Sequence, residues 1–157
     1  MQVLVADDDP VCRKLLRDLI TPWGFEVLTA SDGLEAMSIL ASPDAPPLVI
    51  LDWSMPRMDG LEVCRAVRRQ EDGDRTYILL VTVRGNREEI MKVVLAGADD
   101  YLTKPFEPAD LKIRLRTAVR IIRMQEELAR RGDAHQGSSC GGCAGDTKES
   151  LCPSRRT

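Results

Sequence analysis

Short apolar runs alternate with longer stretches in which apolar residues recur at helical spacing, and this pattern continues to about residue 123. Runs of aliphatic and β-branched residues separated by amphipathic helical stretches are typical of an α/β domain with a parallel sheet. We therefore predict five strands, each followed by a helix. The expected strands are Gln2 to Ala6, Glu26 to Ala30, Leu48 to Leu51, Tyr77 to Thr82 and Asp100 to Leu102.

Capping residues and prolines indicate where the helices begin and end. The first helix is expected to start at Pro10 after the N-cap residue Asp9 and to stop before Pro22, because proline suits a first helical turn but not a helix interior. Asp32 followed by Glu35 resembles a capping box for the second helix. The remaining helices are expected at about Leu61 to Arg69, at about Glu88 to Ala96 with Gly97 as a left-handed C-cap, and from Pro108 to about Arg131.

The last helix is longer than packing on a small sheet requires, since it would extend roughly 36 Å at 1.5 Å per residue. One of its faces is expected to dock on the sheet through Leu111, Leu115, Ala118 and Ile122. Farther along, Ile121, Met124 and Leu128 form a thinner apolar stripe, which is too short to establish a coiled coil. Two alternatives remain for the part of the helix that extends beyond the sheet: it pairs with the same helix of a second copy, or it is a solvated helix end.

The chain is expected to have three segments: a globular domain over residues 1–123, a helical extension over 124–131 and a tail over 132–157. The tail is rich in Gly, Ser, Asp, Thr and Lys, and its aliphatic residues are Ala134, Ala144 and Leu151. Such a composition cannot bury a hydrophobic core, so we expect the tail to be disordered.

Charge and composition exclude several classes of partner. A formal net charge of -3 and a pI near 5.3 give no basic field for nucleic acid, and no helix-turn-helix pattern follows the globular part. No apolar stretch approaches membrane-spanning length, and the amino terminus lacks the pattern of a secretory signal. The cysteine count is odd, at five. We expect a cytoplasmic protein that binds neither nucleic acid nor a membrane.

Right-handed crossovers between these strands predict a flavodoxin-like doubly wound sheet with strand order 2-1-3-4-5. In such a sheet the carboxyl ends of the strands line one crevice, which is where ligands bind. Four strands end in polar residues. These are Asp7 and Asp8 after the first strand, Asp52 after the third, Thr82 at the end of the fourth, and Lys104 shortly after the fifth.

This set of side chains supplies what phosphoryl transfer to a carboxylate requires. Asp52 is a candidate nucleophile, and together with Asp7 and Asp8 it gives the oxygen-rich site that Mg²⁺ prefers. Lys104 can place a positive charge beside one phosphoryl oxygen, and Thr82 can donate its hydroxyl to another. Each residue alone is unremarkable as a cap, turn or strand end. Their conjunction at four strand ends is the specific signal.

The same residues resemble the receiver domains of two-component response regulators, of the chemotaxis-regulator kind, over about residues 1–123. The resemblance rests on Val-Leu-Val-Ala-Asp-Asp-Asp from Val3, Leu-Asp-Trp-Ser-Met-Pro-Arg-Met-Asp-Gly from Leu51, Val-Thr-Val-Arg-Gly from Val81, and Gly-Ala-Asp-Asp-Tyr-Leu-Thr-Lys-Pro-Phe from Gly97. It implies that Asp52 accepts a phosphoryl group from a histidine kinase or a histidine phosphotransfer protein. It also implies that Asp7, Asp8, Asp52 and the backbone carbonyl of Trp53 bind Mg²⁺.

By the same resemblance, Thr82 and Lys104 contact the phosphoryl group and Tyr101 is an aromatic switch. The Lys104-Pro105 peptide is expected to be cis. Phosphorylation would draw Thr82 toward the phosphoryl group and vacate space for Tyr101. The surface formed by the fourth helix, the fifth strand and the last helix would then change for a downstream protein partner, whose identity the sequence does not give.

Two further positions bear on the lifetime of the phosphorylated state. In receivers, the residues two beyond the phosphorylated aspartate and two beyond the threonine flank the path of the hydrolytic water, and here they are Ser54 and Arg84. Neither side chain is a carboxamide or a carboxylate that orients water strongly. We therefore expect slow intrinsic dephosphorylation, over minutes or longer.

Alternative functions attach to other parts of the sequence. A phosphohydrolase of the haloacid-dehalogenase type expects a second aspartate where this chain has Ser54, so we expect a signalling module and not an enzyme. The tail has three alternative interpretations: a zinc site, a redox pair formed by Cys140 and Cys143, or an inert tail with reduced cysteines. The candidate zinc ligands are His135, Cys140, Cys143 and Cys152. The last helix also carries a run of basic residues: Lys112, Arg114, Arg116, Arg120 and Arg123. This run is either a solvated face or a surface that binds acidic residues of a partner. A homodimer formed through this helix is a further alternative.

Overall fold

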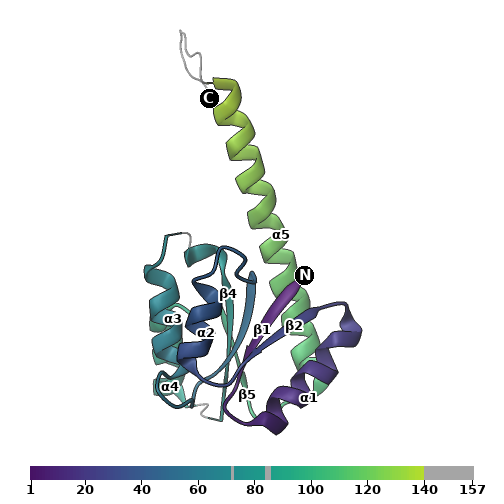
Figure 1. Ribbon diagram of the computed structural model, residues 1–157, viewed down its shortest axis with the longest axis vertical. Coiled ribbons are helices and arrows are strands. Elements are labelled where there is room, and N and C mark those ends of the chain that lie inside the picture. The colour runs from purple at the N-terminus through teal and green to yellow at the C-terminus, as the bar shows by residue number, and fades with distance from the viewer. Residues whose placement is uncertain (72, 84–85, 140–157) are drawn as a thin grey trace. The chain divides into compact units, whose positions relative to one another are not determined.

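The computed structural model describes residues 1–71, 73–83 and 86–139, with side chains described as far as Arg131. Strands and helices alternate along it (Figure 1). The strands are β1 (Gln2–Ala6), β2 (Glu26–Ala30), β3 (Leu48–Asp52), β4 (Tyr77–Thr82) and β5 (Asp100–Thr103). The helices are α1 (Pro10–Ile20), α2 (Gly33–Leu40), α3 (Gly60–Arg69), α4 (Arg87–Ala96) and α5 (Pro108–Ser139), with 3-10 turns at Thr21–Trp23 and Gly73–Arg75.

The five strands form one parallel sheet in the order β2-β1-β3-β4-β5, which confirms the predicted doubly wound topology. Helices α2, α3 and α4 cover one face of the sheet, while α1 and the part of α5 up to Ile122 cover the other (Figure 1). Each face has its own apolar core, because successive side chains of a buried strand point to opposite faces. Leu4, Leu51 and Leu80 belong to the first core. Val5 and Ile50 belong to the second.

The element boundaries follow the sequence pattern closely. Asp9 caps α1 by accepting a hydrogen bond from the backbone N–H of Val11, and Gly97 ends α4 at a φ of 99°, in the left-handed region. Strands β3 and β5 each extend one residue past the predicted end, to Asp52 and Thr103. Both added residues lie at the carboxyl edge of the sheet, where the polar side chains gather.

The expected capping box at the start of α2 forms only in part. Asp32 accepts a hydrogen bond from the N–H of Glu35, as expected. The Glu35 carboxylate, however, accepts from the backbone and hydroxyl of Ser31 and not from the backbone of Asp32. A complete capping box begins α3, where Asp59 and Glu62 each accept from the backbone of the other.

Helix α5 continues past the predicted end near Arg131 and past Gly132, where the tail was expected to begin, as far as Ser139, the last described residue. A single glycine inside a helix costs only about 1 kcal/mol, so Gly132 need not end it. The chain divides into two compact units, Met1–Ile122 and Arg123–Thr157. Within the first unit, the four residues predicted to dock on the sheet are nearly inaccessible; Leu111, Leu115, Ala118 and Ile122 are at most 1% exposed.

The predicted tail ligands Cys140, Cys143 and Cys152 lie outside the described residues, as does the side chain of His135. Over residues 1–71, 73–83 and 86–139, no helix combines the length and the apolar character needed to cross a membrane.

Candidate functional site

The loop from β3 to α3 begins directly after Asp52 and is held close to the sheet. The backbone N–H of Trp53 donates to the carbonyl of Val81 at 2.9 Å, and the N–H of Gly60 donates to the carbonyl of Trp53 at 2.9 Å. A Cβ atom at Gly60 would lie 2.5 Å from the carbonyl oxygen of Asp52 and 2.9 Å from Leu80 Cδ1. Only glycine therefore lets helix α3 begin this close to the end of β3.

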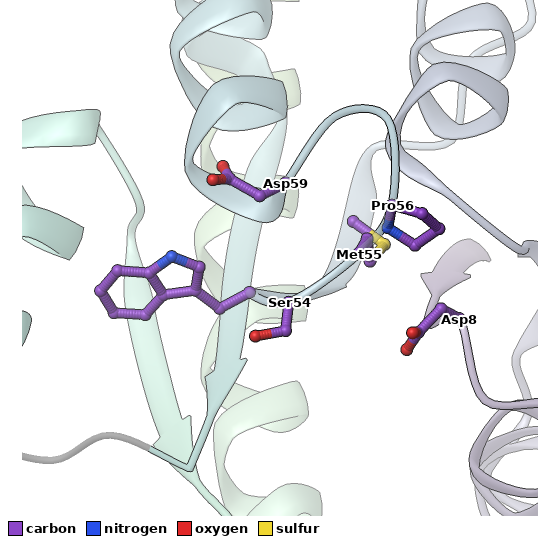
Figure 2. Close-up of a pocket in the computed structure, with 6 residues that line it drawn as sticks. Asp8, Ser54, Met55, Pro56 and Asp59 are labelled. Carbon is purple, nitrogen blue, oxygen red and sulfur yellow. The ribbon is translucent and has the colours of Figure 1, made fainter.

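The same loop borders an open, polar depression of about 440 Å³. Figure 2 shows Asp8 facing the loop that carries Ser54, Met55 and Pro56. The full lining is Asp8, Trp53, Ser54, Met55, Pro56 and Asp59. The depression gives solvent and small ligands access to the acidic end of β1.

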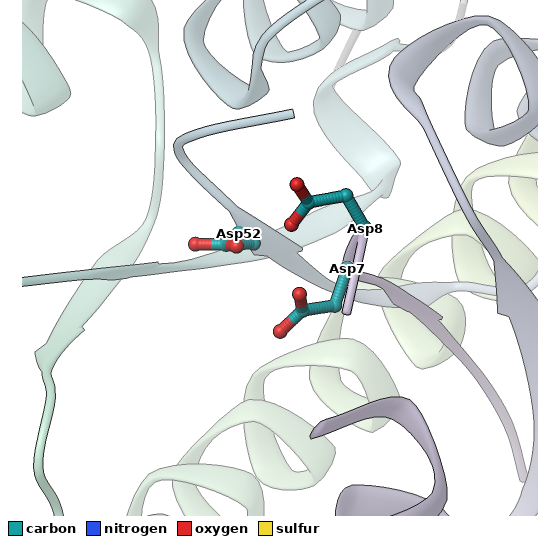
Figure 3. Close-up of side chains that lie close together, drawn as sticks. All are labelled: Asp7, Asp8 and Asp52. Atoms are coloured by element: carbon teal, nitrogen blue, oxygen red, sulfur yellow. The ribbon is translucent and has the colours of Figure 1, made fainter. Parts of the chain in front are cut away.

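Three carboxylates gather at the carboxyl ends of the neighbouring strands β1 and β3. Asp7 and Asp8 follow β1, and Asp52 ends β3; one oxygen atom of each lies within 4.8 Å of the others (Figure 3). The strands are paired so that Ala6 lies beside Leu51, which brings the residues that follow them together. Asp7 is buried, Asp52 is half-buried and Asp8 is exposed. The predicted juxtaposition of these three residues is present in the structure.

Lys104 brings an ammonium group to the same cluster from the end of β5. Its Nζ lies 3.3 Å from Asp7 Oδ2 and 3.6 Å from Asp52 Oδ1. Its backbone N–H donates to the carbonyl of Thr82 at 2.7 Å, and the Lys104-Pro105 peptide is cis, as expected. Burial lowers the pKa of Lys104, but the charges of Asp52 and Asp7 outweigh this effect and raise it, so the side chain is cationic.

The carboxyl group of Asp52 has a pKa raised from 3.8 to about 6. The largest cause is burial, followed by the negative charge of Asp7, and Lys104 opposes both. Three carboxylates facing one ammonium leave an excess of negative charge. An all-oxygen donor set with this excess, open to solvent on one side, fits a hard divalent cation such as Mg²⁺.

Trp53 was expected to offer its backbone carbonyl to the metal. This carbonyl accepts the hydrogen bond from Gly60, and a carbonyl oxygen can hold a second partner. Its role as a metal ligand stays a prediction.

The two expected switch residues lie on one face of the sheet. Thr82, at the end of β4, is 2% exposed, and Tyr101 in β5 is half-buried against the core beneath α3 and α4. The strand register pairs Leu80 with Tyr101 and Thr82 with Thr103. Because side chains alternate with a period of two, Thr82 and Tyr101 point to the same side of the sheet. Of the two residues expected to affect hydrolysis, Ser54 lines the depression, and Arg84 lies outside the described residues.

Two residues near the site were not anticipated from the sequence. One is Gly60, because nothing in the Asp-Gly pair at positions 59 and 60 indicates its close approach to Asp52. Arg13 donates from Nη1 to the backbone carbonyl of Asp7 at 2.6 Å. A side chain that binds a backbone carbonyl leaves no pattern in the sequence, since every residue offers the same acceptor.

Comparison with known proteins agrees with this geometry. The response regulator receiver domain family matches residues 3–116. The chain is 42% identical over 129 residues to response regulator MprA of Mycobacterium ulcerans (strain Agy99), an alignment that covers 82% of this chain and 54% of that protein. It is 44% identical over 120 residues to response regulator MprA of Mycobacterium tuberculosis (strain ATCC 25177 / H37Ra), covering 76% and 51%. The chain thus spans about half the length of these curated relatives.

Solved structures with the same architecture include chemotaxis protein CheY4 of Vibrio cholerae, with a TM-score of 0.69 and 33% identity over 74% of this chain and 97% of that one. Another is the receiver domain of sensor histidine kinase PA1611 from Pseudomonas aeruginosa PAO1, with a TM-score of 0.69 and 28% identity over 75% and 96%. That structure has a magnesium ion coordinated in its active site cleft. Sequence, topology and the acidic cluster agree, and the chain belongs to the response regulator receiver domain family of two-component signalling.

Proposed function

We propose that Asp52 accepts a phosphoryl group from the phosphohistidine of a histidine kinase or a histidine phosphotransfer protein. The observation that carries this proposal is the meeting of three carboxylates within 4.8 Å of one another, with Lys104 Nζ 3.6 Å from Asp52 Oδ1. Asp7, Asp8 and Asp52 would hold Mg²⁺, which when bound supplies positive charge that offsets the negative charge of the phosphoryl oxygens.

In this reaction a carboxylate oxygen of Asp52 attacks phosphorus. A P–O bond forms, and the P–N bond to the donor imidazole breaks, with its electron pair leaving on the nitrogen. A pKa of about 6 leaves Asp52 mostly ionised near pH 7, which is the state that attacks. Lys104 is cationic and lies beside Asp52, so it can pair with an oxygen of the incoming phosphoryl group.

The switch would begin with the change that phosphorylation makes at Asp52, where a carboxylate with one negative charge becomes an acyl phosphate with nearly two. The Thr82 hydroxyl turns toward the new acceptor oxygens, and Tyr101, on the same side of the sheet, moves into the space that Thr82 leaves. Because Tyr101 lies in β5 between α4 and α5, this movement changes the surface that these three elements form. A protein partner that binds only one form of this surface then senses the phosphoryl group.

A direct test incubates the protein with acetyl phosphate and Mg²⁺ and follows phosphorylation by phosphate-affinity electrophoresis and intact mass. We expect the natural chain to be modified and Asp52→Asn not to be. Asp59→Asn is the matched control, since Asp59 lies in the same loop and asparagine still caps helix α3 through its oxygen. Chelation of Mg²⁺ should abolish modification of the natural chain. Equal modification of Asp52→Asn would refute the assignment.

The lifetime of the acyl phosphate follows from Ser54, which lines the depression beside Asp8. A serine hydroxyl orients an attacking water less firmly than a carboxylate or carboxamide does, so we expect hydrolysis over minutes or longer. Decay of the phosphorylated band after removal of the donor measures this rate. Decay within seconds would contradict the expectation.

A further inference from the structure

The Asp8 carboxylate differs from those of Asp7 and Asp52 in how its orientation is restricted. Asp7 and Asp52 are buried or half-buried, so the surrounding side chains restrict them, whereas Asp8 is exposed and faces the open depression. Packing therefore does little to restrict the Asp8 carboxylate. Its direction depends on the backbone conformation of the turn between β1 and α1.

Both peptide groups that flank Asp8 are anchored by side chains. The carbonyl of the Asp7-Asp8 peptide accepts a hydrogen bond from Arg13 Nη1 at 2.6 Å. The N–H of the Asp8-Asp9 peptide donates to Asp7 Oδ1 at 3.0 Å. Fixing the planes of two successive peptides fixes the backbone dihedrals of the residue between them. These two hydrogen bonds thus determine where the Asp8 side chain leaves the turn.

Arg13 is itself well placed to act as an anchor. Its backbone N–H donates to the carbonyl of Asp9 at 3.0 Å, in a helical turn that the Asp9 side chain caps. Its side chain is half-buried and reaches back from α1 to the end of β1. The guanidinium group is planar and holds its donors in a fixed arrangement, whereas a lysine ammonium at this position would be a mobile point donor.

We propose that Arg13 is a positioning residue for the divalent-cation site, fixing the Asp7-Asp8 peptide so that the Asp8 carboxylate is directed toward Asp52. This inference rests on the proposed function, since it takes the acidic cluster to be the Mg²⁺ site. It assigns to Arg13 an action on the cation through Asp8 and no contact with the cation itself.

The sign of the expected effect separates positioning from simple electrostatics. Arg13 is a cation close to an acidic cluster, so if charge alone mattered, its removal would make the cluster more negative and Mg²⁺ would bind more tightly. Loss of an anchor for a ligand has the opposite effect, because residues that orient metal ligands typically contribute about tenfold or more to metal affinity. Removal of Arg13 should therefore weaken binding if it positions Asp8.

The experiment titrates the unphosphorylated full chain with MgCl₂ and follows the fluorescence of Trp53, which directly follows Asp52 and is 7% exposed. The chain has two tryptophans, so a Trp23→Phe background makes Trp53 the sole reporter. Isothermal titration calorimetry of chains that retain Trp23 gives the same comparison independently. The variants are Arg13→Gln, Arg13→Lys and the control Arg17→Gln, which removes an exposed positive charge one turn farther along α1.

We expect Arg13→Gln to raise the half-saturating Mg²⁺ concentration about tenfold. Arg13→Lys should also raise it, although the charge is kept, and Arg17→Gln should leave it within about twofold. At saturating Mg²⁺, Arg13→Gln should reach the rate of phosphorylation of the natural chain. Equal or tighter Mg²⁺ binding by Arg13→Gln would overturn the inference alone. A natural chain that binds no Mg²⁺ would overturn the proposed function as well.

Discussion

Lys104 Nζ lies 3.6 Å from Asp52 Oδ1, and the same ammonium lies 3.3 Å from Asp7 Oδ2. Lys104 thus contacts two carboxylates, and a third, Asp8, lies nearby; even with Arg13 beside the cluster, the negative charges outnumber the positive ones. The protein maintains a site that is electrostatically unfavourable in the absence of a bound cation. Such sites are characteristic of function, because selection for stability alone would remove the excess charge.

The raised pKa of Asp52 predicts that Asp52→Asn stabilises the metal-free protein near neutral pH. The folded-state pKa of about 6 lies above the ordinary value of 3.8, so the folded protein binds a proton more tightly than the unfolded chain does. The stabilisation of the folded protein that comes from protonated Asp52 is fully present below about pH 4 and is lost as the pH rises through about 6. At about pH 7 the variant should be more stable by about 1–2 kcal/mol in free energy of unfolding.

Urea unfolding in EDTA, at about pH 7 and about pH 4.5, measures this difference. The gain from Asp52→Asn should shrink at the lower pH, because the natural carboxyl group is then protonated when folded. Asp18→Asn, which removes an exposed carboxylate from α1, is the control and should change little at either pH. A gain of equal size at both pH values would show that ionisation of Asp52 is not its cause.

Gly60→Ala should both destabilise the domain and impair phosphorylation. The added Cβ would lie 2.5 Å from the carbonyl oxygen of Asp52, so the backbone of the acceptor residue or helix α3 must move. Overpacking of this kind typically costs about 1–3 kcal/mol. Gly24→Ala is the comparison: its φ of 95° is strained for alanine, but a Cβ there meets nothing within 4 Å. Gly24 precedes β2, at the edge of the sheet opposite the acidic cluster.

Denaturant unfolding and the rate of modification by acetyl phosphate together test this pair. Gly24→Ala should lose stability, by about 1 kcal/mol, and keep the natural rate of phosphorylation. Gly60→Ala should lose stability and should also be phosphorylated more slowly. If Gly60→Ala were phosphorylated at the natural rate, the close approach of α3 to β3 would not be needed to place Asp52.

Thr82→Val should separate phosphorylation from its structural effect. Valine has nearly the shape of threonine, so the buried position stays filled, but it has no hydroxyl to turn toward the phosphoryl group. We expect Asp52 to be phosphorylated, more slowly, and Tyr101 to keep its unphosphorylated environment. NMR of labelled tyrosine reports this directly, because the chain has only two tyrosines. Thr103→Val, at the paired and exposed position of β5, should respond like the natural chain.

The sequence was sufficient to predict the strands, their order and the acidic cluster, because these depend on local patterns and on one topological rule. Each polar residue follows an apolar run, and parallel strands end at the same edge of the sheet, so Asp7 and Asp52 had to be neighbours. Local patterns were less informative at helix starts, where the same Asp-to-Glu spacing is compatible with either a full or a partial capping box. Asp32 and Glu35 have the same separation as Asp59 and Glu62, yet only the second pair forms a full capping box, because Ser31 takes the Glu35 carboxylate.

Long side chains that bind backbone atoms were the hardest to foresee. Arg13 and Arg68 both read as ordinary charged residues on amphipathic helices. Both donate to backbone carbonyl groups of residues that the fold brings near. For Arg68, one of these carbonyls belongs to Gly97, 29 positions away in sequence. Which carbonyl lies within reach depends on the packing of helices, and no residue type marks it.

Arg68 supports the last prediction, which concerns stability. It donates to four acceptors at distances of 2.6 to 2.8 Å, and its side chain is 17% exposed; the acceptors are the carbonyls of Gly97, Gly73 and Thr76 and the carboxylate of Asp99. Arg68→Met keeps the apolar stem but removes all four hydrogen bonds and leaves Asp99 without its ion pair. We expect a loss of about 2–4 kcal/mol in free energy of unfolding, measured in urea. Arg68→Lys should recover only part of this, because one ammonium cannot reach four separated acceptors. Arg69→Met, at the adjacent exposed position, controls for the change of charge on α3, and an equal loss in both variants would refute the role assigned to Arg68.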